Sequence, residues 1–172
     1  VDFYCGFLGL RLVKRTGGFE DAAQLHLFYG DAVASPGSLV TFLAWEDGSR
    51  GRVGHGAASE IAFVIDPEAM GFWLTRALQF GVTATGPATE FGEPVLRLTD
   101  PDGIIVKLVG TTEVEPGAAW AVRGIGAKDA ITRLRGATLL SEKPAQTADF
   151  LVRHAGFEAA ATGMVELQAA NG

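Results

Sequence analysis

Three histidines are the side chains in this sequence most suited to ligating a metal, and they are scattered along the chain. His26 stands between Leu25 and Leu27, so on a strand it points away from both leucines. That position favours a histidine that faces a bound small molecule or forms a structural hydrogen bond over one that ligates a metal. His55 lies in a glycine-rich stretch, and His154 lies near the end of a helical pattern, where a cation complements the helix dipole. Neither of these two needs a function to explain it.

A carboxylate and an ammonium group stand on two strand patterns that could lie in one sheet. Glu60 opens the apolar run EIAFVI, and Lys107 interrupts the apolar run GIIVKLV. One interpretation is an ion pair between Glu60 and Lys107 across the sheet, and the other is two separately solvated side chains. Such partly buried pairs persist mainly because leaving either charge without its partner is costly.

Helical and strand patterns alternate in an order that indicates repeated units. A helical pattern opens the chain and ends at Gly9, a second runs from Pro67 to Gly81, and a third ends at Gly156. Three strand patterns follow each of the first two helices, and one precedes the second and the third helix. The strand patterns are LRLVKR, QLHLFYG, SLVTFLAW, IAFVI, VTAT, PVLRLTD, GIIVKLV and RLRGATLLS. The sequence therefore predicts an α+β fold of tandem βαβββ units, in which no strand pattern precedes the first helix.

The repeat also predicts how the chain is divided. Residues 1–110 form an N-terminal pair of units that lacks its first strand, residues 111–130 form a linker rich in glycine, alanine and proline, and residues 131–172 begin a C-terminal module. The strand at the edge left by the missing one would expose unpaired N–H and C=O groups, which proteins usually pair or cover. We therefore expect further polypeptide to complete the sheet.

Composition excludes several classes of function. The net charge is −6 and the basic residues are not massed on one segment, which argues against a nucleic-acid partner. No apolar run approaches the roughly 20 residues of a membrane span, and no secretory leader pattern is visible. The single cysteine, Cys5, lies in an apolar helical pattern, which indicates a packed thiol. These features predict a cytoplasmic protein without a membrane partner.

Several stretches together resemble the vicinal oxygen chelate superfamily, which includes glyoxalase I, bleomycin-resistance proteins and extradiol ring-cleaving dioxygenases. Within it, the chain is similar to dioxygenases that open hydroquinones. The resemblance spans nearly the whole chain and rests on VDFYCGFLGLRLVKRT, LHLFYGDAVASPGSLVTFLAW, SEIAFVID, FGEPVLRLTDPDG and AITRLRGATLL.

The resemblance implies an Fe(II) cofactor held by two histidines and one carboxylate, with open positions for an aromatic diolate and dioxygen. In similar proteins one histidine precedes the first helix, and the other two ligands lie late in the second module. Neither region is present, so we expect no metal ligand and assign no catalytic residue in this chain. The position of Lys107 usually carries a ligand, and the position of Arg135 usually carries a histidine. The resemblance thus places His26, Glu60, Lys107 and Arg135 in a substrate cup without iron.

The function that the resemblance implies is part of an Fe(II)-dependent extradiol-type dioxygenase that acts on hydroquinone-like aromatics. Its partner would be a small aromatic substrate, and self-association stays open. Two alternatives also stay open. One is a metal-free protein that binds a small molecule in the same cup, as bleomycin-resistance proteins do, and the other is a glyoxalase I-like lyase.

Overall fold

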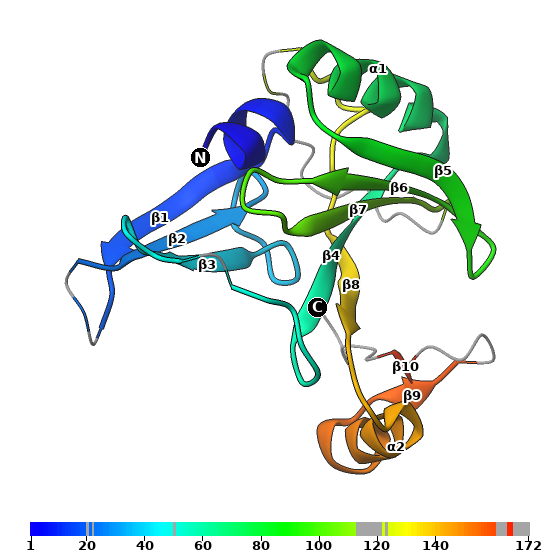
Figure 1. The fold of residues 1–172 in the computed structure, drawn as a ribbon. Coiled ribbons are helices and arrows are strands. Elements are labelled where there is room, and N and C mark those ends of the chain that lie inside the picture. The colour runs from blue at the N-terminus through cyan, green and yellow to red at the C-terminus, as the bar shows by residue number, and fades with distance from the viewer. Residues whose placement is uncertain are drawn as a thin grey trace.

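The computed structural model describes residues 1–19, 21, 23–49, 51–112, 122, 124–160 and 165–166. A three-stranded sheet and a five-stranded sheet form its main body, and a two-stranded ribbon lies beside the last helix (Figure 1). The elements follow in the order η1 (Asp2–Phe7), β1 (Arg11–Gly17), β2 (Leu25–Gly30), β3 (Val40–Ala44), β4 (Ala58–Ile65), η2 (Pro67–Ala69), α1 (Met70–Phe80), β5 (Ala84–Glu90), β6 (Glu93–Thr99), β7 (Ile105–Gly110), β8 (Leu134–Leu139), α2 (Pro144–Ala155), β9 (Glu158–Ala159) and β10 (Val165–Glu166).

This order confirms the predicted α+β fold of tandem units. One helix is followed by three strands, and a strand and a second helix are then followed by three more. The third unit begins with β8 and α2 and is shorter. Half of the predicted linker, residues 113–121 and 123, lies outside the described residues, so the domain boundaries stay a prediction.

The five-stranded sheet has the order β5-β6-β7-β4-β8. Strand β4 runs parallel to β7, and α1 lies between these two strands in the chain. Strand β8 runs antiparallel along the other side of β4. The first strand of the third unit therefore completes the sheet of the second unit. It brings side chains from residues 134–139 next to those of β4.

The three-stranded sheet has the order β1-β2-β3, with both pairs antiparallel. Among the strands that the structure describes, none pairs with the outer edge of β3. Cross-strand partners share a face of a sheet, and the register aligns Leu12 with Tyr29 and Leu27 with Phe42. These four side chains belong to the main core or pack against it, so this face is covered.

Local chemistry explains where α1 begins and ends. The Asp66 carboxylate accepts a hydrogen bond from the backbone N–H of Glu68 at 2.8 Å, and Pro67 occupies the first turn, where its missing N–H costs nothing. The helix stops at Gly81, whose φ of 65° is left-handed. The predicted helix from Pro67 to Gly81 is confirmed, with η2 as its first turn.

The main core lies between η1, α1 and the inner faces of both sheets. Trp73 of α1 is fully buried, and Phe7 of η1 packs edge-on against it with ring centroids 5.8 Å apart. Two buried polar contacts join elements distant in sequence. Tyr4 donates a hydrogen bond to Asp100 at 2.9 Å, and Arg76 donates to the carbonyl of Phe7 at 2.7 Å.

Asp100 fixes the conformation of the DPDG turn between β6 and β7. Its carboxylate accepts hydrogen bonds from the backbone N–H groups of Asp102 at 2.9 Å and Ile104 at 2.7 Å, which fixes the turn, and from the Tyr4 hydroxyl. Burial and the neighbouring Asp100 carboxylate both raise the pKa of Tyr4. The same aspartate therefore shapes the turn and ties it to η1.

Helix α2 differs from α1 because none of its residues is buried. It lies with the ribbon of β9 and β10 at the end of the molecule opposite α1 (Figure 1). No helix among the described residues is both long enough and apolar enough to cross a membrane.

Candidate functional site

The outer face of the five-stranded sheet carries a closed ring of four charged side chains, hereafter the ion ring. It consists of Glu60, Glu90, Arg97 and Lys107. The Lys107 ammonium lies 3.2 Å from Glu60 Oε2 and 3.1 Å from Glu90 Oε2. Arg97 Nε lies 2.8 Å from Glu60 Oε1, and Arg97 Nη1 also pairs with Glu90. Each carboxylate thus binds both cations, and each cation binds both carboxylates.

Strand register explains why the ion ring forms. Arg97 of β6 stands directly opposite Lys107 of β7, and two like charges in such positions repel. Glu60 approaches from β4 and Glu90 from the end of β5, so carboxylates on either side separate the cations. The Lys107 side chain is only 11% exposed and that of Glu60 16%. Because these charges are partly buried, each is stabilised mainly by its oppositely charged partners rather than by water.

Strand β8 adds a further contact to the ring. The Thr138 hydroxyl donates a hydrogen bond to Glu60 Oε2 at 3.0 Å. Nearby on the same strand, Arg135 Nη2 lies 3.5 Å from Glu93 Oε2. The third unit therefore supplies side chains to the charged face of the second unit.

The surroundings of the two glutamates lower their pKa values. Burial raises the pKa of Glu60, but hydrogen bonds from Arg97, Thr138 and Lys107 outweigh burial and hold it below the ordinary 4.5. For Glu90 the hydrogen bond from Arg97 is the largest influence and also lowers the pKa. Hydrogen bonds to Glu60 and Glu90 raise the pKa of Arg97. Glu60, Glu90 and Arg97 thus all favour their charged forms.

We predict that acid weakens the fold through Glu60. A carboxyl whose pKa is lower in the folded chain than in the unfolded chain stabilises the fold above its unfolded pKa, and this contribution is lost as the pH falls through the folded pKa. The free energy of unfolding should therefore fall as the pH drops below the ordinary glutamate pKa of 4.5, and fall less steeply in Glu60→Gln. Urea unfolding of both proteins across this range measures the slopes. Equal slopes would show that Glu60 titrates alike in both states.

The ion ring does not fit a bound divalent metal. The Lys107 ammonium occupies the space between the two carboxylates, and it is a cation rather than a ligand. Within the described residues, no three His, Cys, Asp or Glu side chains gather closely enough to hold a metal ion. The side chains present therefore do not match the two histidines and one carboxylate that Fe(II) would require.

The Glu60–Lys107 ion pair expected as one of two interpretations is confirmed. The sequence interpretation missed Glu90 and Arg97. The alternation of PVLRLTD could have indicated Arg97, because its register partner on the neighbouring strand is Lys107. Arg135 lies on β8 beside this face, where its guanidinium contacts Glu93. The substrate-binding role predicted for these residues stays a prediction.

His26 lies elsewhere, on the uncovered side of the three-stranded sheet. Its register partners are Thr16 and Leu43, and the partners of the next residue on that side, Phe28, are Lys14 and Thr41. We call this surface the open face; it comprises Lys14, Thr16, His26, Phe28, Thr41 and Leu43. The His26 and Phe28 rings lie 4.1 Å apart, and the Lys14 ammonium lies 5.5 Å from the centre of the Phe28 ring. The structure thus places His26 apart from Glu60, Lys107 and Arg135.

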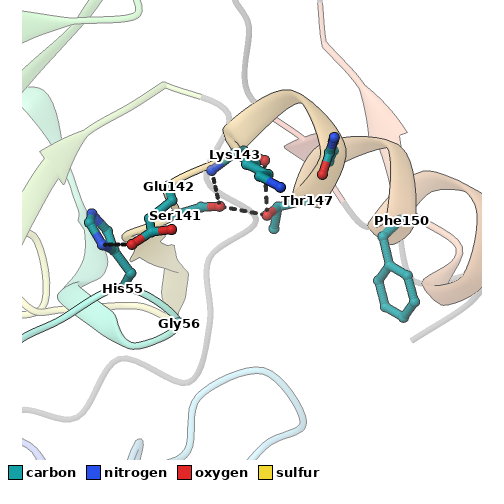
Figure 2. A pocket seen from close by; sticks show the side chains of 8 residues that line it. His55, Gly56, Ser141, Glu142, Lys143, Thr147 and Phe150 are labelled. Atoms are coloured by element: carbon teal, nitrogen blue, oxygen red, sulfur yellow. Dashed lines mark hydrogen bonds and ion pairs between the residues drawn. The ribbon is translucent and has the colours of Figure 1, made fainter.

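A shallow hollow lies between the loop before β4 and the start of α2. Figure 2 shows His55 facing Glu142 across it, and His55 Nδ1 lies 3.2 Å from Glu142 Oε1. The two side chains are 61% and 73% exposed, so the pair contributes little. The residues that line the hollow are His55, Gly56, Ser141, Glu142, Lys143, Gln146, Thr147 and Phe150. None of these lining residues belongs to the ion ring or to the open face.

Comparison with known proteins supports one family. No protein-family model matches the sequence. The chain is 38% identical over 158 residues to a protein of Bacillus subtilis (strain 168) named "Putative ring-cleaving dioxygenase MhqO", a match that covers 92% of this chain and 50% of that protein. The crystal structure of a "putative dioxygenase" from Bacillus subtilis subsp. subtilis str. 168 superposes with a TM-score of 0.85 at 38% identity, over 91% of this chain and 50% of the other.

This chain belongs to the vicinal oxygen chelate superfamily. The crystal structure of glyoxalase I from Zea mays shows the same superfamily fold, with a TM-score of 0.68 at 16% identity over 92% of this chain and 50% of that one. The chain spans about half the length of the curated superfamily relatives that it matches.

Proposed function

We propose that the protein takes part in Fe(II)-dependent, extradiol-type cleavage of hydroquinone-like rings. The observation that supports this proposal is the 38% identity, over 92% of the chain, to a relative named as a ring-cleaving dioxygenase. The fold agrees, because a crystal structure of a dioxygenase-type protein superposes on 91% of the chain. The small aromatic substrate is part of the same proposal.

The part proposed for this chain is to form the frame and to bind the aromatic ring. Its described residues do not assemble an iron site, since Lys107 fills the space between Glu60 and Glu90 and no other cluster of ligands is present among them. We therefore propose that the iron ligands come from polypeptide outside these residues. Fe(II), where bound, would supply the site at which the diol and dioxygen react.

Iron content and product formation test the proposal. We predict that the 172-residue chain, loaded with Fe(II) without oxygen and desalted, retains far less than one iron per chain, while the full-length product of its gene retains about one. On addition of hydroquinone and oxygen, only the latter should consume oxygen and form a ring-opened product. Stoichiometric iron in the 172-residue chain would contradict the assignment of the ligands. If neither protein consumed oxygen, the proposed dioxygenase activity would be contradicted.

Binding of a small molecule without metal is the second candidate. The observation that favours it is the ion ring, which satisfies four charges on a sheet face without any metal. The same experiment separates the two, because a binding protein would retain an aromatic ligand with no iron present and release it unchanged.

A further inference from the structure

Side chains stop entering the core at the start of β8, although the chain continues through a strand, a helix and a ribbon. Ala130 and Ile131 are 5% and 8% exposed and belong to the main core, and Leu134 packs against that core. The structure describes every residue from 135 to 160, and none of them is buried. We call residues 135–160 the arm. Because burial of apolar side chains is the main source of stability, the arm depends on contacts of another kind.

Backbone pairing with β4 is the first of these contacts. Among the described strands, β8 pairs with β4 on one side and with no strand on the other. The Gly56 N–H donates to the Leu140 carbonyl at 2.7 Å, and the Leu140 N–H donates to the Ala57 carbonyl at 3.0 Å. Strand β7, in contrast, has a partner on each side, and five of its six residues are buried. Opening the arm therefore breaks far fewer contacts than opening β7.

The ion ring holds the middle of β8 through one side chain. The Thr138 hydroxyl donates to Glu60 Oε2 at 3.0 Å, and the Thr138 carbonyl accepts from the Ser59 hydroxyl at 3.1 Å. Glu60 is itself fixed by Lys107 at 3.2 Å and by Arg97 at 2.8 Å. Thr138 thus meets a carboxylate that the rest of the sheet already holds in place.

Helix α2 depends on β8 for its place on the molecule. It has 12 residues, and an isolated helix of that length is marginal in water. Its main contacts are with β9 and β10, which follow it in the chain. The ion pair between His55 and Glu142 reaches the main body just before α2, but both side chains are more than half exposed. Release of β8 therefore removes most of what attaches α2.

We propose that the arm opens from the main body as one unit while the two large sheets stay folded, and that the contact of Thr138 with Glu60 keeps it closed. Residues 130–134 stay in or against the core and form the hinge. Opening uncovers the outer edge of β4 and the Glu60 side of the ion ring. This inference goes beyond the proposed function and depends on neither iron nor substrate.

Amide hydrogen exchange of the 172-residue chain, followed peptide by peptide, tests the proposal. The hydrogen-bonded amides of β8 and α2 should exchange roughly 100-fold faster than those of β7, and with one shared free energy of opening. Because a partial opening exposes little surface, low concentrations of urea should hardly change these rates, whereas they should accelerate exchange in β7. The proposal fails if β8 exchanges as slowly as β7, or if α2 and β8 open with different free energies.

Two substitutions at one position test the contact that keeps the arm closed. Thr138→Val keeps the shape of the side chain but removes the hydroxyl, and exchange in both β8 and α2 should become roughly tenfold faster. Thr138→Ser keeps the hydroxyl and should exchange as the unaltered chain does. Strand β5 is the control, because it is also an exposed edge strand but lies at the other side of the same sheet.

The response of each element to Thr138→Val decides between the outcomes. Faster exchange in β8 and α2 with no change in β5 would support an arm that opens as one unit. An equal acceleration in β5 would show that the substitution loosens the whole sheet, and would overturn the proposal. An acceleration confined to β8 would show that α2 opens by itself, and would overturn it as well.

Discussion

Replacing Lys107 with methionine is expected to lower the free energy of unfolding by roughly 3 kcal/mol, because removal of one partner leaves buried charges uncompensated. Methionine retains most of the length of the side chain but removes the ammonium that lies within 3.2 Å of Glu60 and 3.1 Å of Glu90. Arg97 then faces two carboxylates alone. Urea unfolding monitored by circular dichroism measures the loss.

The double change of Glu60→Gln with Lys107→Met should cost less than the sum of the two single changes. Glutamine no longer carries the charge that Lys107→Met leaves without its partner, so part of the penalty is removed. Lys128→Met is the matched control, because Lys128 is exposed, and its effect should stay within about 0.5 kcal/mol. Additive single effects would show that Glu60 and Lys107 are not coupled.

Replacing Arg76 with methionine should have the second large effect, a loss of about 3 kcal/mol, because buried carbonyl groups lose their donors. Arg76 is 6% exposed, and its guanidinium donates hydrogen bonds to the carbonyls of Phe7 and Gly6, each at 2.7 Å. It also lies 4.5 Å from the centre of the Phe80 ring, within range of a cation–π contact. The side chain thus connects α1 to the end of η1, where a cation complements the helix dipole.

Thermal and urea unfolding of Arg76→Met measure this contribution. Arg153→Met serves as the comparison, since Arg153 is 69% exposed and pairs with Asp149 on its own helix. Arg76→Lys should recover only part of the loss. Lysine keeps the positive charge, but its ammonium can reach fewer carbonyls than a guanidinium. If Arg76→Met and Arg153→Met unfold alike, the buried contacts of Arg76 do not stabilise the fold.

The local sequence predicted the helices and strands well, because the residues that begin, end and pattern each element are close together in the chain. Turn residues and alternation indicated the strands, and Pro67 and Gly81 marked the ends of α1. The extent of β5 was predicted less well. Its pattern was interpreted as residues 82–85, whereas the strand continues past Gly86 and Pro87 to Glu90. Proline is tolerated there because β5 is an edge strand and its register shifts between Thr85 and Ala88.

Because the predicted strand stopped before Glu90, the sequence predicted the Glu60–Lys107 pair but not the other members of the ion ring. Glu90 reaches Lys107 because β5 runs on to the turn before β6, and no pattern within residues 82–90 indicates this contact. The contact of Thr138 with Glu60 was also beyond sequence reasoning. It depends on β8 pairing with β4, a long-range arrangement that local propensity does not determine.

The pairing of β8 with β4 also affects how the chain is made. Thr138 and Glu60 lie 78 positions apart, so the ribosome completes β4 well before its neighbour exists. At about 5–20 residues per second, the edge of β4 waits roughly 4 to 16 s for its partner. During that interval the nascent chain presents an apolar strand with open hydrogen-bonding groups, the kind of segment that chaperones bind and that aggregates when it meets another copy. Synthesis that stalls before residue 134 would prolong this state, so slow codons in the segment before β8 should lower the yield of folded protein without changing its sequence.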